Sequence, residues 1–250
     1  MCLIVFAWRP NGPVPLLVAA NRDEFYARPS LPLGQWPDVP GLHAGRDLEA
    51  GGTWLGIAEG GRFAALTNIR DPQAAAGARS RGELVKGFLA GPGSIEDYAE
   101  AVAGRIADYS GFNLLLGDGS RLGYFSSAEP ALRWLDEGVY GLSNAGLDTP
   151  WPKVRRARQA LADRMDDGDD VALLDLLADD RQAADGELPE TGVGVATERL
   201  LSSIFIASAH YGTRASTVVR CMADGSTALR ERTFGPQGAR LQDVELYLRG

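Results

Sequence analysis

The cysteine at position 2 directly follows Met1 in the opening stretch MCLIVFAW. If Met1 is removed, Cys2 becomes the first residue and carries both a thiol and a free α-amine. Because an α-amine has an unperturbed pKa of about 8, a useful fraction of it is a neutral base near pH 7. Cys2 could then act as nucleophile and base without a histidine. A buried free thiol that packs as a small hydrophobic side chain is the alternative, and both interpretations stay open.

The segment ANRDEF carries polar residues directly after a predicted strand: Asn21, Arg22 and Asp23. That strand should pair with the strand of Cys2, so these side chains could reach the N-terminus. An aspartate in this place can hold or orient an α-ammonium group. Because neighbouring residues on a strand face opposite ways, Arg22 and Asp23 need not both enter one site.

Two asparagines also follow predicted strands, Asn68 in the segment LTNIR and Asn144 in the segment GLSNAG. An asparagine amide at such a position can donate hydrogen bonds to a developing oxyanion, which contributes on the order of a few kcal/mol when the donor is preorganised. Arg214, in the late segment YGTRAST, is a further polar residue beside a predicted strand.

Each of these residues also has a purely structural interpretation. The NRDE segment could be a turn with a salt-bridged exit, Asn68 and Asn144 could cap turns, and Arg214 could pair with a carboxylate. Trp54 is expected to be a core or cleft-lining aromatic residue.

Other kinds of site fit the sequence poorly. The two cysteines and two histidines, at positions 2, 43, 210 and 221, lack the close ligand pairs of a zinc site, so we predict no metal. The acidic run DDGDD lacks the spacing of a calcium loop, and GLSNAG misses the serine nucleophile elbow by one residue. TGVGVAT lacks the last glycine of a dinucleotide-binding loop.

Composition and charge narrow the class of protein. A chain of 250 residues can bury a full core as one domain, 1–250. A net charge of -8 with a pI of about 4.9 would repel nucleic acid. Without a membrane-length apolar run or a signal-peptide pattern, we expect a cytoplasmic protein with no membrane insertion. Only Lys86 and Lys153 among the 25 basic residues are lysines, an arginine bias that hints at a GC-rich bacterial genome.

The elements that must position these residues follow from hydrophobic periodicity. Apolar runs bounded by turn residues predict strands at 2–8, 16–20, 53–58, 63–68, 112–116, 122–126, 139–142, 217–222, 228–233 and 244–248. Ser80 and Ser94, each followed three residues later by an acidic residue, predict helices over 81–90 and 95–106. Helical spacing predicts two more helices, at 153–165 and 171–177. The pattern indicates an α+β fold of stacked antiparallel sheets with helices grouped outside.

Six segments, in order along most of the chain, resemble the NRDE family, also called the transport-and-Golgi-organisation family: MCLIVFAW, AANRDEF, GGTWLGI, LTNIR, LSNAGLDTPWPK and YGTRAST. That family is similar in turn to N-terminal-nucleophile hydrolases, in the branch with penicillin V acylase and bile salt hydrolase. The resemblance implies a four-layer αββα sandwich of two antiparallel sheets flanked by helices.

The same resemblance implies site residues, with Cys2 as the nucleophile. The implied catalytic residues are Cys2, Asp23, Asn68, Asn144 and Arg214. The candidate substrate-binding residues are Asn21, Arg22, Trp54 and Arg70. One departure concerns the hydrolase branch, which carries an arginine three residues before its aspartate. This chain has Ala20 there and places Arg22 directly before Asp23.

Two functions from different classes follow from the resemblance. One is an amidohydrolase that acts on an unidentified acyl amide through Cys2 and requires no cofactor. The other is a binding protein on the same scaffold, because the NRDE family is also associated with haem trafficking and with lipid or acyl-CoA metabolism. Haem as a ligand would require an apolar cleft and an axial ligand such as His43, His210 or Cys2.

Overall fold

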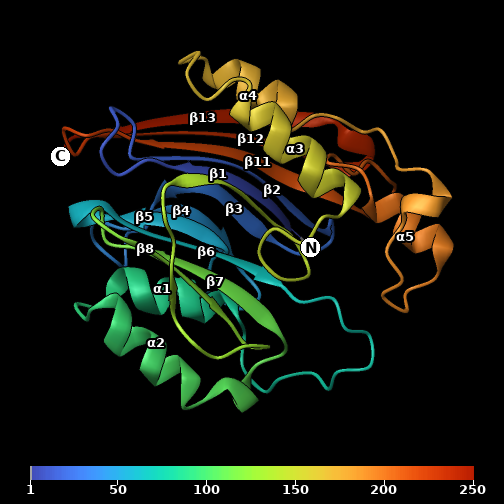
Figure 1. Cartoon of the computed structure of the whole chain (residues 1–250), viewed down its shortest axis with the longest axis horizontal. Coiled ribbons are helices and arrows are strands. Elements are labelled where there is room, and N and C mark those ends of the chain that lie inside the picture. The colour runs from blue at the N-terminus through green and yellow to red at the C-terminus, as the bar shows by residue number, and fades with distance from the viewer. Residues whose placement is uncertain (1) are drawn as a thin grey trace.

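Two antiparallel β-sheets pack face to face, and helices cover both outer faces, in the computed structural model of the chain (Figure 1). The structure describes residues 2–250, so Met1, whose removal the nucleophile hypothesis requires, lies outside the described residues. The predicted α+β fold with four αββα layers is confirmed.

The first sheet carries the N-terminal hairpin near its centre. Cys2 pairs with Arg22 and Trp8 pairs with Leu16, so the second strand pairs antiparallel with the first strand over its full length. The second strand continues to Phe25 instead of ending at residue 20, and the NRDE segment therefore lies on a strand rather than after it. Across the sheet the order is β10 (Gly138–Leu142), β1 (Cys2–Trp8), β2 (Leu16–Phe25), β11 (Tyr211–Cys221), β12 (Thr227–Phe234) and β13 (Arg240–Leu248).

The second sheet contains three strands that the sequence pattern did not predict. One contains Pro32, one is polar, and one has two residues, so none shows a clear apolar alternation. Across this sheet the order is β3 (Ser30–Gln35), β4 (His43–Asp47), β5 (Leu55–Ala58), β6 (Arg62–Asn68), β7 (Phe112–Gly117), β8 (Leu122–Ser126) and β9 (Arg133–Trp134).

Helices α1 (Gly82–Ala90) and α2 (Ile95–Ala103) cover the outer face of the second sheet, and α3 (Pro152–Ala162) and α4 (Asp170–Leu176) cover the first (Figure 1). All four were predicted, with ends that differ by a few residues. A fifth helix, α5 (Val195–Leu201), was not predicted. It is short and begins after Gly194, whose φ of 84° only glycine adopts readily.

The two predicted serine caps have different outcomes. The Ser94 side chain accepts a hydrogen bond from the Asp97 backbone N–H at 3.0 Å, as expected for a helix N-cap. Ser80 does not cap α1, because the N-cap position is Arg81 and makes no side-chain capping bond.

Strand β1 is buried on both faces, which fixes the direction of every side chain along it. Cys2, Ile4 and Phe6 contribute to the core between the sheets, whereas Leu3 and Val5 pack toward the helices of the first sheet. Cys2 therefore begins a rigid central strand. In the part of the chain that is described, no helix has the length and apolar character needed to cross a membrane.

Candidate active site

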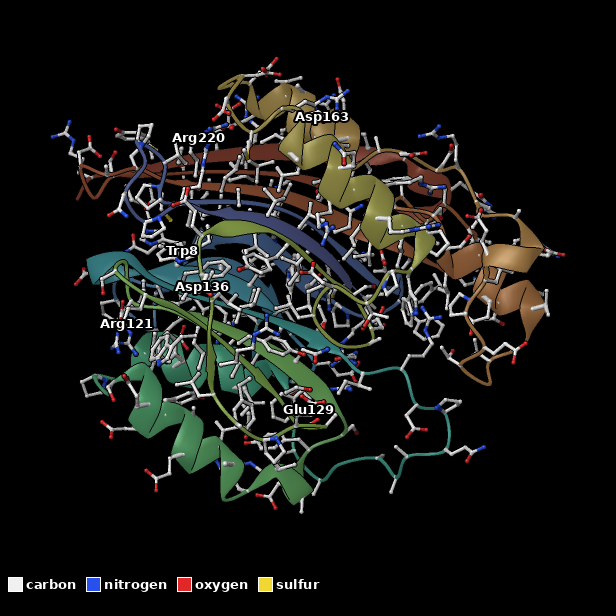
Figure 2. All side chains as sticks on the ribbon, in the orientation of Figure 1. Trp8, Arg121, Glu129, Asp136, Asp163 and Arg220 are labelled. Carbon is white, nitrogen blue, oxygen red and sulfur yellow. The ribbon has the colours of Figure 1, made fainter. Side chains whose placement is uncertain are left out.

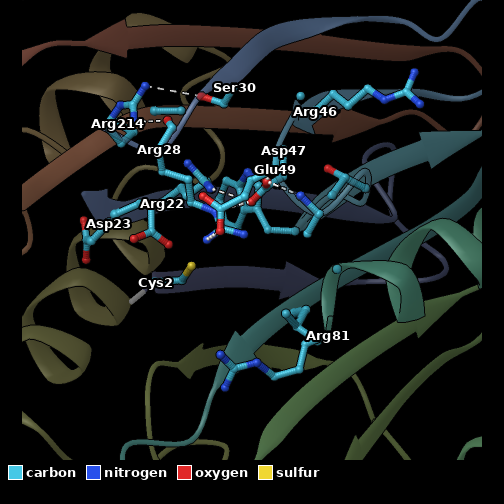
Figure 3. A pocket seen from close by; sticks show the side chains of 18 of the residues that line it. Cys2, Arg22, Asp23, Arg28, Ser30, Arg46, Asp47, Glu49, Arg81 and Arg214 are labelled. Carbon is cyan, nitrogen blue, oxygen red and sulfur yellow. Dashed lines mark hydrogen bonds and ion pairs between the residues drawn. The ribbon is translucent and has the colours of Figure 1, made fainter. Parts of the chain in front are cut away.

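A cavity of about 620 Å³ opens where the start of β1, the far end of β2 and the end of β6 meet. Its wall includes residues from both sheets and from the start of α1 (Figure 3). A volume of this size suits a small-molecule ligand. The predicted site residues that line it are Cys2, Arg22, Asp23, Trp54, Asn68 and Arg214.

Cys2 is held at this cavity by the first sheet. Its side chain shares a face of β1 with Ile4, and its carbonyl accepts a hydrogen bond from Ser143 Oγ at 2.9 Å. Burial raises the pKa of the Cys2 thiol, and the charge of the Asp23 carboxylate raises it further. The protonated thiol is therefore the resting form near neutral pH, so any reaction as a nucleophile needs a base.

Arg22 lies directly opposite Cys2 in the strand register and shares its face of the sheet. The Nη2 atom of Arg22 is 3.4 Å from Asp47 Oδ2, the oxygen that Arg28 Nε contacts at 2.6 Å. Figure 3 shows this group beside Cys2. The shared carboxylate holds a guanidinium close to the thiol, where it would favour a thiolate.

Alternation along β2 places Asp23 on the opposite face from Arg22. Asp23 is only 1% exposed, and its Oδ1 accepts a hydrogen bond from Thr213 Oγ1 at 2.8 Å. Burial raises the pKa of the Asp23 carboxyl, and the nearby Lys153 ammonium acts against this shift. Arg22 and Asp23 thus approach the start of β1 from the two faces of one strand.

A fully buried lysine lies behind Asp23. Lys153, in the first turn of α3, is 1% exposed, and within residues 2–250 its Nζ has no hydrogen-bond partner. Burial lowers the pKa of Lys153 to about 8, and the Asp23 carboxylate partly opposes this change. Lys153 therefore places a second cation close to the start of β1, on the side away from Arg22.

Asn68 is the last residue of β6 and lines the cavity. Within the described chain its side-chain amide makes no hydrogen bond to protein, so the amide is available to a ligand. Asn144 does not line the cavity. Its Nδ2 donates to the Asn68 carbonyl at 2.8 Å, and its own carbonyl accepts a hydrogen bond from the Arg70 N–H at 2.8 Å. Asn144 thus fixes the backbone that carries Asn68.

Arg214 donates hydrogen bonds to the backbone of the cavity wall. Its Nη1 donates to the carbonyls of Phe25 and Arg28, both at 2.9 Å, and its Nη2 lies 3.3 Å from Ser30 Oγ. These bonds fix the connection between β2 and β3. Trp54, which is 8% exposed, contributes apolar surface to the wall.

Two candidate substrate-binding residues lie away from this cavity. Asn21 donates through Nδ2 to the carbonyls of Leu177 and Ile204, both at 2.9 Å, in the layer between the first sheet and its helices. Arg70 forms an ion pair with Glu198, and its guanidinium lies over the ring of Trp151. Both residues connect parts of the fold next to the site.

Neither histidine lines the cavity. His43 begins β4, and His210 directly precedes β11. The second cysteine, Cys221, ends β11, where burial raises its pKa to about 11. Among residues 2–250, no group of three or more histidine, cysteine or acidic residues could hold a metal ion.

Sequence reasoning missed three residues next to Cys2: Ser143, Lys153 and Arg81. Ser143 lies within the segment GLSNAG, but it was considered only as a serine nucleophile and not as a hydrogen-bond donor to the Cys2 backbone. The signal at Lys153 was its residue type, because only Lys86 and Lys153 among the 25 basic residues are lysines. The signal at Arg81 was its place at a helix start, where a cation is electrostatically unfavourable.

The cavity thus combines a thiol, a guanidinium held beside it and a side-chain amide available to a ligand. A thiol is a strong nucleophile once it is deprotonated. A free amide can stabilise an oxyanion. The arrangement suits attack on a carbonyl carbon and lacks a histidine base within the lining residues.

Comparisons with known proteins identify relatives along the whole chain. The family described as "Transport and Golgi organisation 2" matches residues 1–236. The Transport and Golgi organization protein 2 homolog of Homo sapiens is 36% identical over 259 residues, which cover 94% of this chain and 93% of the human protein. The Drosophila melanogaster Transport and Golgi organization protein 2 is 33% identical over 178 residues, 64% of this chain and 63% of that protein.

Two solved structures share the fold at 11% sequence identity. The C2A mutant of the conjugated bile acid hydrolase from Clostridium perfringens matches with a TM-score of 0.55 and covers 98% of this chain and 92% of that one. The Caenorhabditis elegans ortholog of N-acylethanolamine-hydrolyzing acid amidase matches with a TM-score of 0.51 and covers 87% of this chain and 92% of that one. At this identity the likeness is one of fold.

Proposed function

Because this chain belongs to the Transport and Golgi organisation 2 family and shares its fold with N-terminal-nucleophile hydrolases, we propose that it hydrolyses an acyl amide through Cys2. The observation that carries the proposal is the position of Cys2. Its thiol lines a ligand-sized cavity together with Asn68, while neither histidine does. The base must then come from elsewhere, and the α-amine of Cys2 is the group within the same residue.

The reaction requires removal of Met1. The α-amine of Cys2 then takes the thiol proton, and Sγ attacks the amide carbonyl carbon while the Asn68 amide donates to the oxyanion. The C–N bond breaks as the α-ammonium returns its proton to the leaving amine. Water, deprotonated by the same amine, attacks the thioester carbonyl, breaks the C–S bond and releases a carboxylic acid. Arg22 favours the thiolate, and Asp23 orients the α-ammonium.

Turnover of a panel of acyl amides tests this proposal, after intact-mass measurement has established that Met1 is absent. Cys2→Ala should abolish turnover. Cys221→Ser, the matched control, should leave turnover unchanged because Cys221 does not line the cavity. Asn68→Ala should lower kcat by roughly 10²–10³, the usual loss for one oxyanion donor.

The competing function is a carrier of haem or of a lipid. Absence of turnover across the panel by the processed protein, together with saturable haem binding and a Soret shift that Cys2→Ala removes, would favour the carrier. Retention of Met1 in every molecule would rule out the mechanism through the α-amine of Cys2.

A further inference from the structure

Six arginines line the cavity of a chain whose net charge is -8: Arg22, Arg28, Arg46, Arg79, Arg81 and Arg214. Four of them contact carboxylates: Arg22 and Arg28 share Asp47, Arg46 pairs with Asp38, and Arg79 pairs with Glu83. The donors of Arg214 are occupied by backbone carbonyls and Ser30. Arg81 differs from these five, because it has neither an ion pair nor a full set of hydrogen bonds within the described residues.

Arg81 lines the cavity, where Glu24 is also present, but no carboxylate of the described residues lies within ion-pair distance of its guanidinium. Within residues 2–250 it forms no ion pair, and its one side-chain hydrogen bond runs from Nη1 to the Gly111 carbonyl at 3.1 Å. A guanidinium has five N–H donors, so most of them are available to a ligand. Figure 3 shows Arg81 on the other side of Cys2 from the group formed by Arg22, Arg28 and Asp47.

The fold holds this cation where the local electrostatics oppose it. Arg81 is the N-cap residue of α1, at the positive end of the helix dipole. The backbone there is tightly packed: a Cβ on Gly52 would lie 2.4 Å from the Gly82 carbonyl carbon, and the Thr53 N–H donates to the Gly82 carbonyl at 3.1 Å. Arg81 is therefore anchored in place, and a bound anion would offset its unfavourable position.

We propose that the substrate is an anionic acyl amide, carrying a carboxylate or a phosphate, and that Arg81 recognises this group. This inference rests on the proposed function, which supplies the amide as the bond that is hydrolysed. A guanidinium binds either oxyanion through two parallel hydrogen bonds. A neutral amide of the same size would cover Arg81 without supplying an anionic partner, and an uncompensated buried charge lowers affinity.

Binding to the full-length Cys2→Ala protein tests the inference apart from turnover. The probes share one acyl chain: N-decanoylglycine and N-decanoylphosphoethanolamine are anionic, and N-decanoylethanolamine is neutral. At least one anionic probe should bind roughly 10- to 100-fold more tightly than the neutral probe, the range expected for a charge-assisted hydrogen bond. Comparison of the two anionic probes distinguishes carboxylate from phosphate.

Substitution of Arg81 should remove the preference for an anion. Arg81→Met in the Cys2→Ala background should bring the probes to similar affinity, and Arg81→Lys should keep part of the preference because the charge remains. Arg121→Gln removes one positive charge outside the cavity, from a residue paired with Glu96 and Asp118, and should change nothing (Figure 2). The preference should also weaken as salt rises, a measurement that needs no Arg81 variant.

The outcomes separate this inference from the proposed function. Equal binding of all three probes, binding of none, or an anion preference that Arg81→Met leaves intact would overturn the role of Arg81. Hydrolysis of neutral and anionic amides at equal kcat/KM would overturn it as well, while leaving Cys2 as the nucleophile. An Arg81-dependent anion preference without hydrolysis by the processed enzyme would support the recognition of an anion and contradict the hydrolase.

Discussion

Cys2 lies between charged groups of opposite sign that come from consecutive residues of one strand. Arg22 shares its face and favours a thiolate, whereas the Asp23 carboxylate approaches from the other face and opposes one. Lys153 offsets part of the charge of Asp23 from within the helix layer. The ionisation of the thiol and of the α-amine is therefore set by at least three side chains, of which the sequence indicated two.

Substitution of Lys153 by methionine should change how stability depends on pH. Burial lowers the pKa of Lys153 to about 8 in the folded protein, below its ordinary value of 10.5. Between these values the unfolded chain binds a proton that the native protein has lost, so the free energy of unfolding of the wild type should rise with pH. Lys153→Met lacks this contribution. Urea unfolding of both proteins from pH 7 to pH 10 measures the difference.

The stability of the wild type relative to Lys153→Met should therefore increase from about pH 8 to pH 10. Lys86→Met serves as the control, since Lys86 is the other lysine and lies outside the buried cluster. A constant difference between wild type and Lys153→Met across this range would show that Lys153 titrates normally.

At the scale of elements, the polar site residues lie on strands that continue past their apolar parts. β2 runs to Phe25 and β11 begins at Tyr211, so the NRDE and TRAST segments face each other in one sheet. Turn and loop residues have the same composition as a polar strand end, so periodicity could not distinguish them. The consequence is functional, because alternation along β2 is what separates Arg22 from Asp23.

Ser94→Ala should destabilise the protein through α2. The hydroxyl of Ser94 satisfies the Asp97 N–H at the helix start, and loss of such a cap costs about 1 kcal/mol. Ser80→Ala is the matched control: its sequence context is similar, but Ser80 makes no capping bond, and we expect a change under roughly 0.5 kcal/mol. Chemical denaturation of both variants measures these values, and equal losses would contradict the assigned caps.

At the scale of the whole molecule, the sequence predicts the layers better than the site. Ten apolar runs and four amphipathic segments were enough for stacked sheets with outer helices, because burial in a sandwich imposes a period on each element. The position of Cys2 beside Arg22 follows from a simple hairpin. Arg81 and Lys153 could not be predicted in the same way, since they reach Cys2 from helices on opposite sides of the sandwich.

The net charge of the whole chain differs in sign from the charge of the arginine side chains in the cavity wall. The net charge is -8, yet the cavity wall carries arginines from β2, β4 and the start of α1. Long-range attraction would therefore not draw an anion to this protein, and selection of an anionic ligand depends on contacts inside the cavity.

Mass spectrometry of the enzyme during turnover tests the central claim most directly. We predict that protein without Met1, quenched while it hydrolyses an anionic N-decanoyl amide, carries one decanoyl group on the Cys2 peptide. Hydroxylamine should release the group because the bond is a thioester, and Cys2→Ala should carry none. Turnover without an adduct on Cys2, an adduct on Cys221, or continued turnover by Cys2→Ala would contradict the account.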